Sequence, residues 1–160
     1  MVIPTLLYGA AESWALGQAQ MDRLDAFNAT CLRRILGVQH RHPTMMRNVE
    51  VYAATKQPAI SDLLRKHRLR WLGHVARMQD STAVKQLLFS TASRVGPARQ
   101  AGVQRRVQGA PAMAFNSVLL SDVQSVLTGV GGMPGAQAWY QTSLDRTRWK
   151  GIVSNCGTVG

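Results

Sequence analysis

Acidic residues are scarce in this chain of 160 residues, which has 8 Asp and Glu against 19 Lys and Arg. Two-metal phosphoryl transfer needs carboxylates held close enough to share divalent ions. The acids are scattered, and the close pair Asp22 and Asp25 fits a negative helical turn favoured by the helix dipole. No polymerase or nuclease centre is visible, and we do not expect the chain to be an enzyme.

Long apolar runs and paired cysteines are also missing. No run approaches the roughly 20 apolar residues of a membrane span, so we expect no membrane association. Cys31 and Cys156 have no partner at ligand spacing, and His40 with His42 lacks a third ligand. The sequence therefore predicts no disulfide framework, no metal site and no cofactor. We expect the protein inside the cell, in an RNA-containing compartment such as an organelle or the nucleus.

No strand-like alternation is present, and apolar residues recur instead at helical spacing. The first expected helix spans residues 12–36, with Met21, Leu24, Phe27, Cys31 and Ile35 on its apolar face. The whole pattern predicts a mainly α protein: a small helical bundle, a basic linker and C-terminal helices, at 1–80, 81–111 and 112–160. Shorter helices are expected at 44–55, 83–92, 112–127 and 136–153.

The segment Leu63–Met78 is the most informative, with five Arg or Lys, two His and no carboxylate in sixteen residues. The pattern predicts a helix capped by Ser61 or a neighbour. Its apolar residues fall within about 60° of one another on a helical wheel: Ile60, Leu64, Trp71, Val75 and Met78. The opposite side carries Lys66, Arg70, Gly73 and Arg77. One face is therefore expected to close a core, while the other presents cations.

This cation-rich helix is the main candidate for nucleic-acid binding. A solvated face usually mixes charges of both signs, whereas this one lacks acids, so we favour contact with phosphates by Arg65, Lys66, Arg68, Arg70 and Arg77. Arg33 and Arg34 also suit a helix C-terminus, so phosphate contact and dipole stabilisation both stay open for them. Trp71 is interpreted as a core anchor in preference to a base-stacking platform.

The connector between Asp80 and Asp122 contains no acidic residue and lacks apolar periodicity. It predicts an extended basic linker whose candidate RNA contacts are Arg94, Arg99, Arg105 and Arg106. The net charge of +11 makes nucleic acid the expected partner of the chain. Fifteen of the 19 cations are Arg, a bias that suits phosphate recognition but that GC-rich codons would equally produce.

Three segments in order resemble the region after the palm of non-LTR retrotransposon reverse transcriptases. They are IPTLLYGAAESW at 3–14, FNATCLRRILGV at 27–38 and LLRKHRLRWLGHVARM at 63–78. A weaker block, AWYQTSLDRTRWKGIV at 138–153, is similar to a later block of the same family. The resemblance covers most of the chain, and the third segment is the most specific.

The resemblance implies a helical thumb and connector that grip RNA by backbone contact. Its candidates are Arg33, Arg34, Arg65, Lys66, Arg68, Arg70 and Arg77. The paired aspartates of the family belong to the palm, which would lie before residue 1, and neither the endonuclease nor a zinc knuckle is present. The family's basic Gly-Arg-Pro segment is degraded here to RVGPARQAGVQRRVQGAP at 94–111.

Three functions remain open. The favoured one is a non-catalytic RNA-binding module in a ribonucleoprotein, such as an organellar ribosome, with structured RNA and other ribonucleoprotein subunits as partners. The second is the thumb of a split reverse transcriptase whose palm is a separate polypeptide. The third is a helical protein-interaction domain or a decayed remnant, which predicts weak RNA affinity that depends little on salt.

Overall fold

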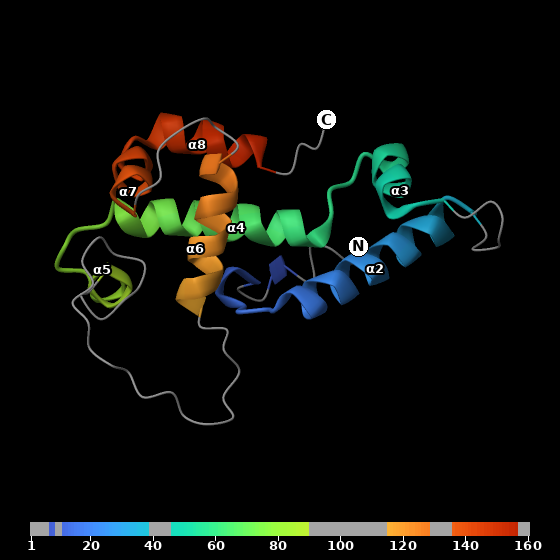
Figure 1. Cartoon of the computed structure of the whole chain (residues 1–160), viewed down its shortest axis with the longest axis horizontal. Coiled ribbons are helices and arrows are strands. Elements are labelled where there is room, and N and C mark those ends of the chain that lie inside the picture. Colours follow the sequence, from blue (N-terminus) through green and yellow to red (C-terminus); the bar gives the residue numbers. More distant parts are fainter. Residues whose placement is uncertain (1–6, 9–10, 39–45, 90–114, 129–135, 157–160) are drawn as a thin grey trace, which may run out of the picture.

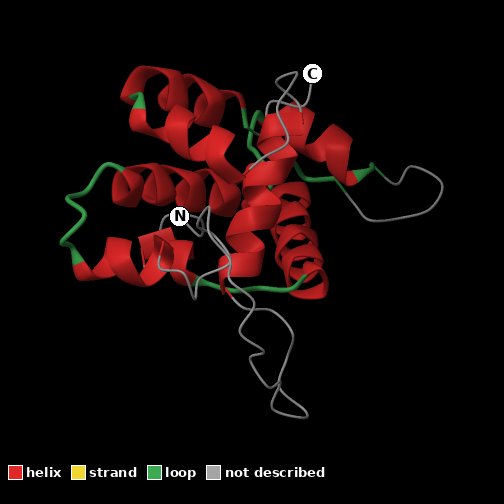
Figure 2. Ribbon diagram, turned by 60° about the vertical axis from the view of Figure 1, so that its left-hand side comes forward, coloured by secondary structure: helices red, strands yellow, loops and turns green. Residues whose placement is uncertain are grey.

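The computed structural model describes residues 7–8, 11–38, 46–89, 115–128 and 136–156. All regular structure within these ranges is helical, which confirms the mainly α prediction (Figures 1 and 2). Within the same ranges, a 3-10 turn, η1 (Ala11–Ser13), precedes seven α-helices: α2 (Gln18–Ile35), α3 (Asn48–Thr55), α4 (Ile60–Ala76), α5 (Ala83–Phe89), α6 (Phe115–Thr128), α7 (Ala136–Leu144) and α8 (Arg146–Asn155). None of the described helices is long and apolar enough to cross a membrane.

Helix α4 is the central element, and most of the other helices pack on it (Figure 1). Its C-terminal half contributes Leu69, Leu72 and Val75 to a buried cluster. Helices α5 to α8 complete that cluster with Leu88, Leu119, Val123, Trp139, Trp149 and Val153. Helices α6, α7 and α8 therefore share a core with α4, although the predicted linker at 81–111 separates them from α4 in the sequence.

The N-terminal half of α4 packs against elements that precede it in the sequence. Ile60 and Leu64 form a second buried cluster with Met21 of α2 and Ala11 of η1. Ile60, Leu64 and Val75 are all buried, as the helical wheel predicts, and Trp71 and Met78 pack partly buried against the larger cluster. One apolar helix thus joins two groups of helices that are distant in sequence.

The predicted apolar face of the first helix is partly wrong. Phe27 is 56% exposed and Ile35 is 79% exposed, whereas Asn28 and Arg33 are buried. Arg33 turns inward because its guanidinium donates to the Met46 carbonyl at 2.9 Å and to Asn48 Oδ1 at 2.6 Å, at the start of α3. These polar bonds rotate α2 and leave two apolar side chains in solvent.

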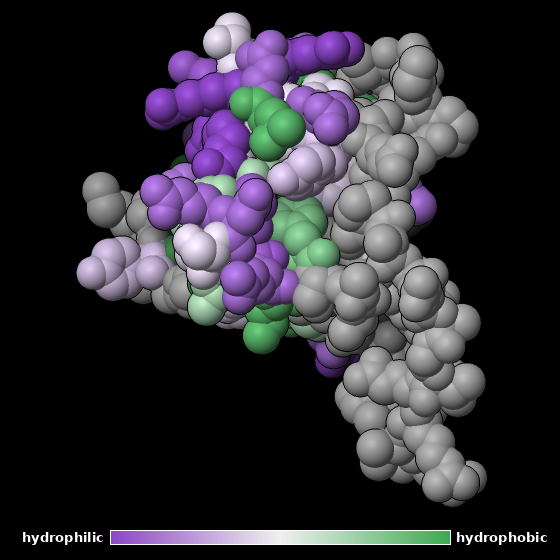
Figure 3. Space-filling view, turned by 90° about the vertical axis from the view of Figure 1, so that its left-hand side faces the viewer, coloured by the Kyte–Doolittle hydropathy of each residue, from purple (hydrophilic) through white to green (hydrophobic). Residues whose placement is uncertain are grey.

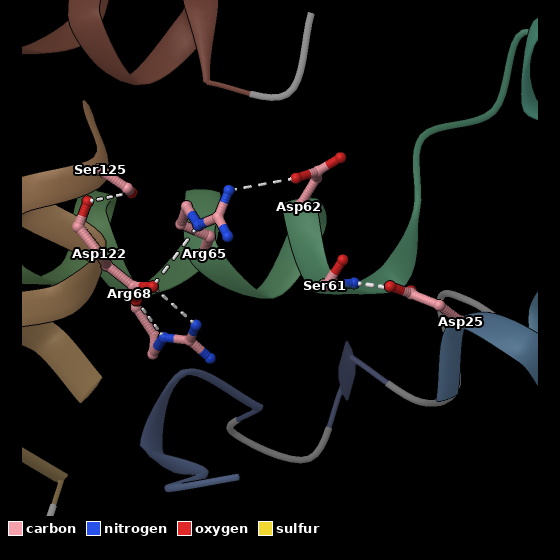
Figure 4. Close-up of polar contacts among 7 residues, drawn as sticks. All are labelled: Asp25, Ser61, Asp62, Arg65, Arg68, Asp122 and Ser125. Carbon is pink, nitrogen blue, oxygen red and sulfur yellow. Dashed lines mark hydrogen bonds and ion pairs between the residues drawn. The ribbon is translucent and has the colours of Figure 1, made fainter. Parts of the chain in front are cut away.

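The predicted cap of α4 is also wrong. The N-cap residue is Ala59, whose side chain makes no capping bond. Asp25 of α2 supplies the acceptor instead, because its Oδ1 lies 3.0 Å from the Ser61 amide (Figure 4). A carboxylate near the positive end of a helix stabilises it, so Asp25 fixes the angle between α2 and α4.

The last predicted helix, 136–153, is in fact two helices. Asp145 ends α7 and caps α8, because its Oδ1 accepts hydrogen bonds from the amides of Thr147 and Arg148 at 2.9 and 3.1 Å. Short acidic side chains compete in this way with a continuous helix. Residues 90–111 of the predicted linker lie outside the described residues.

Candidate nucleic-acid interface

The outward face of α4 carries a row of basic side chains. Arg70 is exposed, while Lys66 and Arg77 are half-buried. The three recur at helical spacing over about 16 Å of helix axis, with His67 and His74 beside them. Asp62, the acid of α4, lies one turn before Lys66 on the same face and pairs with Arg65 at 3.3 Å, so the row of cations begins after it. From Lys66 to Arg77, α4 therefore contributes three cations and no acid to this side of the molecule.

Trp149 fixes α8 against α4 beside this row. Its indole Nε1 donates to the Leu69 carbonyl at 2.9 Å, and its ring lies against Gly73. A Cβ at position 73 would overlap the indole, so glycine is required for this close approach. Gly73 was predicted to face outward with the cations; the structure corrects this, because Trp149 covers it.

Lys66 marks where α8 borders the basic row, since its Nζ lies 3.4 Å from the Ser154 carbonyl. Lys150 and Arg146 lie one and two turns before Ser154 on the same face of α8, and both are exposed. At the other end, Arg77 Nη1 donates to the Ser143 carbonyl at 2.6 Å, close to the start of α8. We call Lys66, Arg70, Arg77, Arg146 and Lys150 the α4–α8 basic surface.

The distribution of polar residues agrees with this placement. Figure 3 views the end of the molecule that holds α5, α7 and the C-terminal part of α4. Hydrophilic side chains gather over its upper part, at the level of α7 and α8, and green apolar atoms appear below them. Helix α5, which lies below α7 in Figure 1, has the exposed apolar residues Val84 and Leu87.

Two of the predicted phosphate contacts on α4 are paired with acids instead, and one of them is buried. Arg68 is 2% exposed and donates to both carboxylate oxygens of Asp122 on α6, at 2.5 and 3.1 Å (Figure 4). Arg65 lies 3.5 Å from Asp122 and 3.3 Å from Asp62. The acids that balance these cations come partly from another helix, so the local sequence did not show them. Arg68 in this position holds α6 to α4.

The other predicted contacts lie elsewhere. Arg33 is buried between α2 and α3, and Arg34 is exposed on α2, away from α8 in Figure 1. Arg94, Arg99, Arg105 and Arg106 lie outside the described residues. The structure thus brings together only Lys66, Arg70 and Arg77 from the predicted set, among the residues that it describes.

Sequence reasoning missed Arg146 and Lys150 as members of the surface. They lie 4 residues apart within RTRWK, on one face of a helix. That spacing was a usable signal only once α8 was known to begin at Arg146. Their position beside Lys66 depends on the Trp149 contact, which joins residues 80 positions apart.

Lys85, in the predicted linker, makes intramolecular contacts. Its Nζ lies 2.7 Å from Asp80 and donates to the Met78 carbonyl at 2.8 Å. The hydrogen bond to Asp80 raises the pKa of Lys85 above its ordinary value, against the opposing effect of burial. This protonated lysine ties α5 to the segment that follows α4.

Comparison with known proteins gives one informative similarity. The chain is 32% identical over 84 residues to an uncharacterized transposon-derived protein of Caenorhabditis elegans. The matched segment covers 50% of this chain and 29% of that protein, so the chain spans less than a third of its relative. No protein-family model matches the chain, and no solved structure matches it. The similarity points to a transposon origin.

Proposed function

We propose that this chain is a non-catalytic RNA-binding module, derived from the thumb and connector of a retrotransposon reverse transcriptase, that contacts structured RNA through its phosphates. The observation that carries the proposal is the α4–α8 basic surface, where cations of two helices lie side by side and the neighbouring described acids, Asp62 and Asp145, lie at the starts of the two helices. The similarity to a transposon-derived protein supports the origin.

Recognition of the backbone suits this surface better than reading of bases. Phosphate contacts by Lys and Arg set affinity and orientation without reporting sequence. RNA helices have a deep, narrow major groove that side chains cannot read, so proteins recognise them mainly by shape and phosphate position. Trp71 and Trp149 pack against the core or within it, which leaves them unsuited to base stacking. The role we propose is architectural, within a ribonucleoprotein such as an organellar ribosome.

The test is fluorescence anisotropy with two labelled RNA hairpins of unrelated sequence. Arg70→Glu, Lys150→Glu and their combination should each weaken binding to both hairpins alike. The slope of log affinity against log salt should fall by about 1 for each phosphate that the variant no longer neutralises. Arg23→Glu on α2 is the matched control, because it makes the same charge change at an exposed position outside the surface.

Three results would overturn the proposal. Arg23→Glu could weaken binding as much as Arg70→Glu, which would mean that only net charge matters. Binding could also prove weak and nearly independent of salt, which favours the protein-interaction or remnant alternative. Copurification of a separate polypeptide with paired palm aspartates would favour the split-polymerase alternative instead.

A further inference from the structure

A second surface, on α2, is apolar and has no covering element among the described residues. Its members Leu24, Phe27, Cys31 and Ile35 fall within about 80° on a helical wheel and extend over about 16 Å of axis. Phe27 and Ile35 are largely exposed, and Leu24 and Cys31 are half-buried. We call these four residues the α2 stripe. An exposed apolar stripe of this length commonly marks an interaction site.

The N-terminal end of the stripe opens into a hollow. This hollow has a volume of about 510 Å³ and is lined by Trp14, Leu16, Gln20, Arg23 and Leu24. Three of the five are apolar, and Leu24 belongs to both the hollow and the stripe. A space of this size can receive a large apolar side chain of a partner, in the way that helix-in-groove complexes use anchoring residues.

The charges beside the stripe define the partner's chemistry. Arg23 and Arg34 lie along one side of the stripe, both are exposed, and neither has an acidic partner within 4.0 Å in the described part of the chain. The nearby acids are engaged elsewhere: Asp25 accepts from the Ser61 amide, and Asp22 accepts from Gln18. One side of the stripe is therefore lined by two arginines that form no ion pair among the described residues.

We infer that the α2 stripe is a docking site for an acidic amphipathic helix of a partner protein. Apolar residues of that helix at positions three and four apart would cover Phe27, Cys31 and Ile35, with one anchor in the hollow. Its carboxylates would face Arg23 and Arg34, as charged flanking positions do in coiled coils. The α2 stripe lies on a different helix from the α4–α8 basic surface, so this inference does not depend on RNA binding.

The probe is a labelled synthetic helix of about 18 residues, roughly five turns, with Leu at heptad core positions and Glu at the flanking positions. A matched peptide carries Lys in place of Glu. The Glu peptide should bind the full chain at least about tenfold more tightly than the Lys peptide. Arg23→Glu combined with Arg34→Glu should reverse this preference, which excludes simple apolar adhesion.

Two sets of variants locate the site. Phe27→Asp and Ile35→Asp should each reduce affinity for the Glu peptide by about tenfold or more without changing the melting temperature much, because both side chains are mostly exposed. Leu87→Asp on α5 is the control, since Leu87 is 80% exposed and lies outside the stripe. In a Cys156→Ser background, the Glu peptide should slow thiol labelling of Cys31.

Several outcomes would overturn the inference. The Glu peptide could fail to bind, or Leu87→Asp could lower affinity as much as Phe27→Asp. Light scattering could show a dimer that Phe27→Asp converts to a monomer, which would assign the stripe to a second copy of the chain. A loss of RNA binding in Phe27→Asp, with its melting temperature unchanged, would assign the stripe to the nucleic acid.

Discussion

At the residue scale, the same residue type has opposite roles depending on what other helices bring near it. Arg68 and Arg70 are two positions apart, yet Arg68 is buried against Asp122 and Arg70 is exposed. The local sequence showed both as cations without acids. Only the packing of α6 on α4, which places Asp122 beside a residue 54 positions earlier in the chain, separates the buried arginine from the exposed one.

The buried pair of Arg68 and Asp122 gives the first prediction. In Asp122→Asn, the guanidinium of Arg68 stays buried without its negative partner. Breaking a buried ion pair in this way lowers the free energy of unfolding by about 3–5 kcal/mol. Urea unfolding should show this loss. Asp62→Asn is the control, because Asp62 bonds the partly exposed Arg65 in the first turn of α4, and its loss should be below about 1 kcal/mol. Equal losses for the two variants would contradict the structural role of Arg68.

Two glycines provide a matched pair for the second prediction. Gly73→Ala should lower the free energy of unfolding by about 1–3 kcal/mol, because its methyl group would overlap Trp149 in a packed core. Gly151→Ala, where nothing lies within 4 Å, should instead raise that free energy by about 0.5–1 kcal/mol. Both effects can be read from urea or thermal unfolding. If Gly73→Ala is also stabilising, α8 does not lie against α4 in this way.

At the element scale, helix existence was predictable and helix rotation was not. Apolar periodicity located α4 correctly, because Ile60, Leu64 and Val75 all face the core. The rotation of α2 agrees with the bonds between Arg33 and the start of α3, which join residues 13 and 15 positions apart and have no signal in the local sequence. The break at Asp145 did have a signal, since an Asp followed by polar residues is a helix N-cap pattern.

The Asp145 cap gives a prediction for α8. Asp145→Ala should lower the free energy of unfolding by about 1 kcal/mol, because two amides at the helix start lose their acceptor. Ser154→Ala, whose exposed hydroxyl bonds the Lys150 carbonyl within the same helix, should change it by less than about 0.5 kcal/mol. The affinity of the Asp145→Ala variant for RNA should also fall at temperatures close to the melting temperature of that variant, because α8 carries Lys150. No change in either quantity would mean that α7 and α8 are one helix.

The contacts of Lys85 with Asp80 and Met78, which join α5 to the segment after α4, predict that the free energy of unfolding depends on pH. The raised pKa of Lys85 means that the folded protein holds this proton more tightly than the unfolded chain. Its contribution to stability is thus complete below the ordinary pKa of 10.5 and is lost as pH rises through the folded value. The difference in unfolding free energy between wild type and Lys85→Met should therefore stay nearly constant below pH 10.5 and narrow as the pH rises above it.

The same comparison in Asp80→Asn protein separates the effect of the Lys85–Asp80 bond from the effect of the change in net charge. In Asp80→Asn protein, the principal cause of the raised pKa is absent. The difference in unfolding free energy between Asp80→Asn and the double variant Asp80→Asn/Lys85→Met should then vary much less over the same pH range. A difference that stays constant in the wild-type background would show that the Lys85–Asp80 bond is not formed in solution.

At the scale of the whole molecule, α4 organises both the fold and the proposed binding surface. Its inner face joins two apolar clusters, and its outer face aligns with α8. The basic character of the chain was evident from the sequence. The α4–α8 basic surface was not, because it depends on the Trp149 contact between residues 80 positions apart, half the length of the chain.

The α4–α8 basic surface is proposed to contact RNA in the cell. The most direct measurement is ultraviolet crosslinking of the tagged protein in its native cells, with sequencing of the bound RNA and mass spectrometry of the crosslinked peptides. One abundant structured RNA should be recovered, crosslinked to peptides from α4 and α8 around Arg70 and Lys150. Crosslinks confined to α2, or recovery of no RNA above an untagged control, would contradict this role.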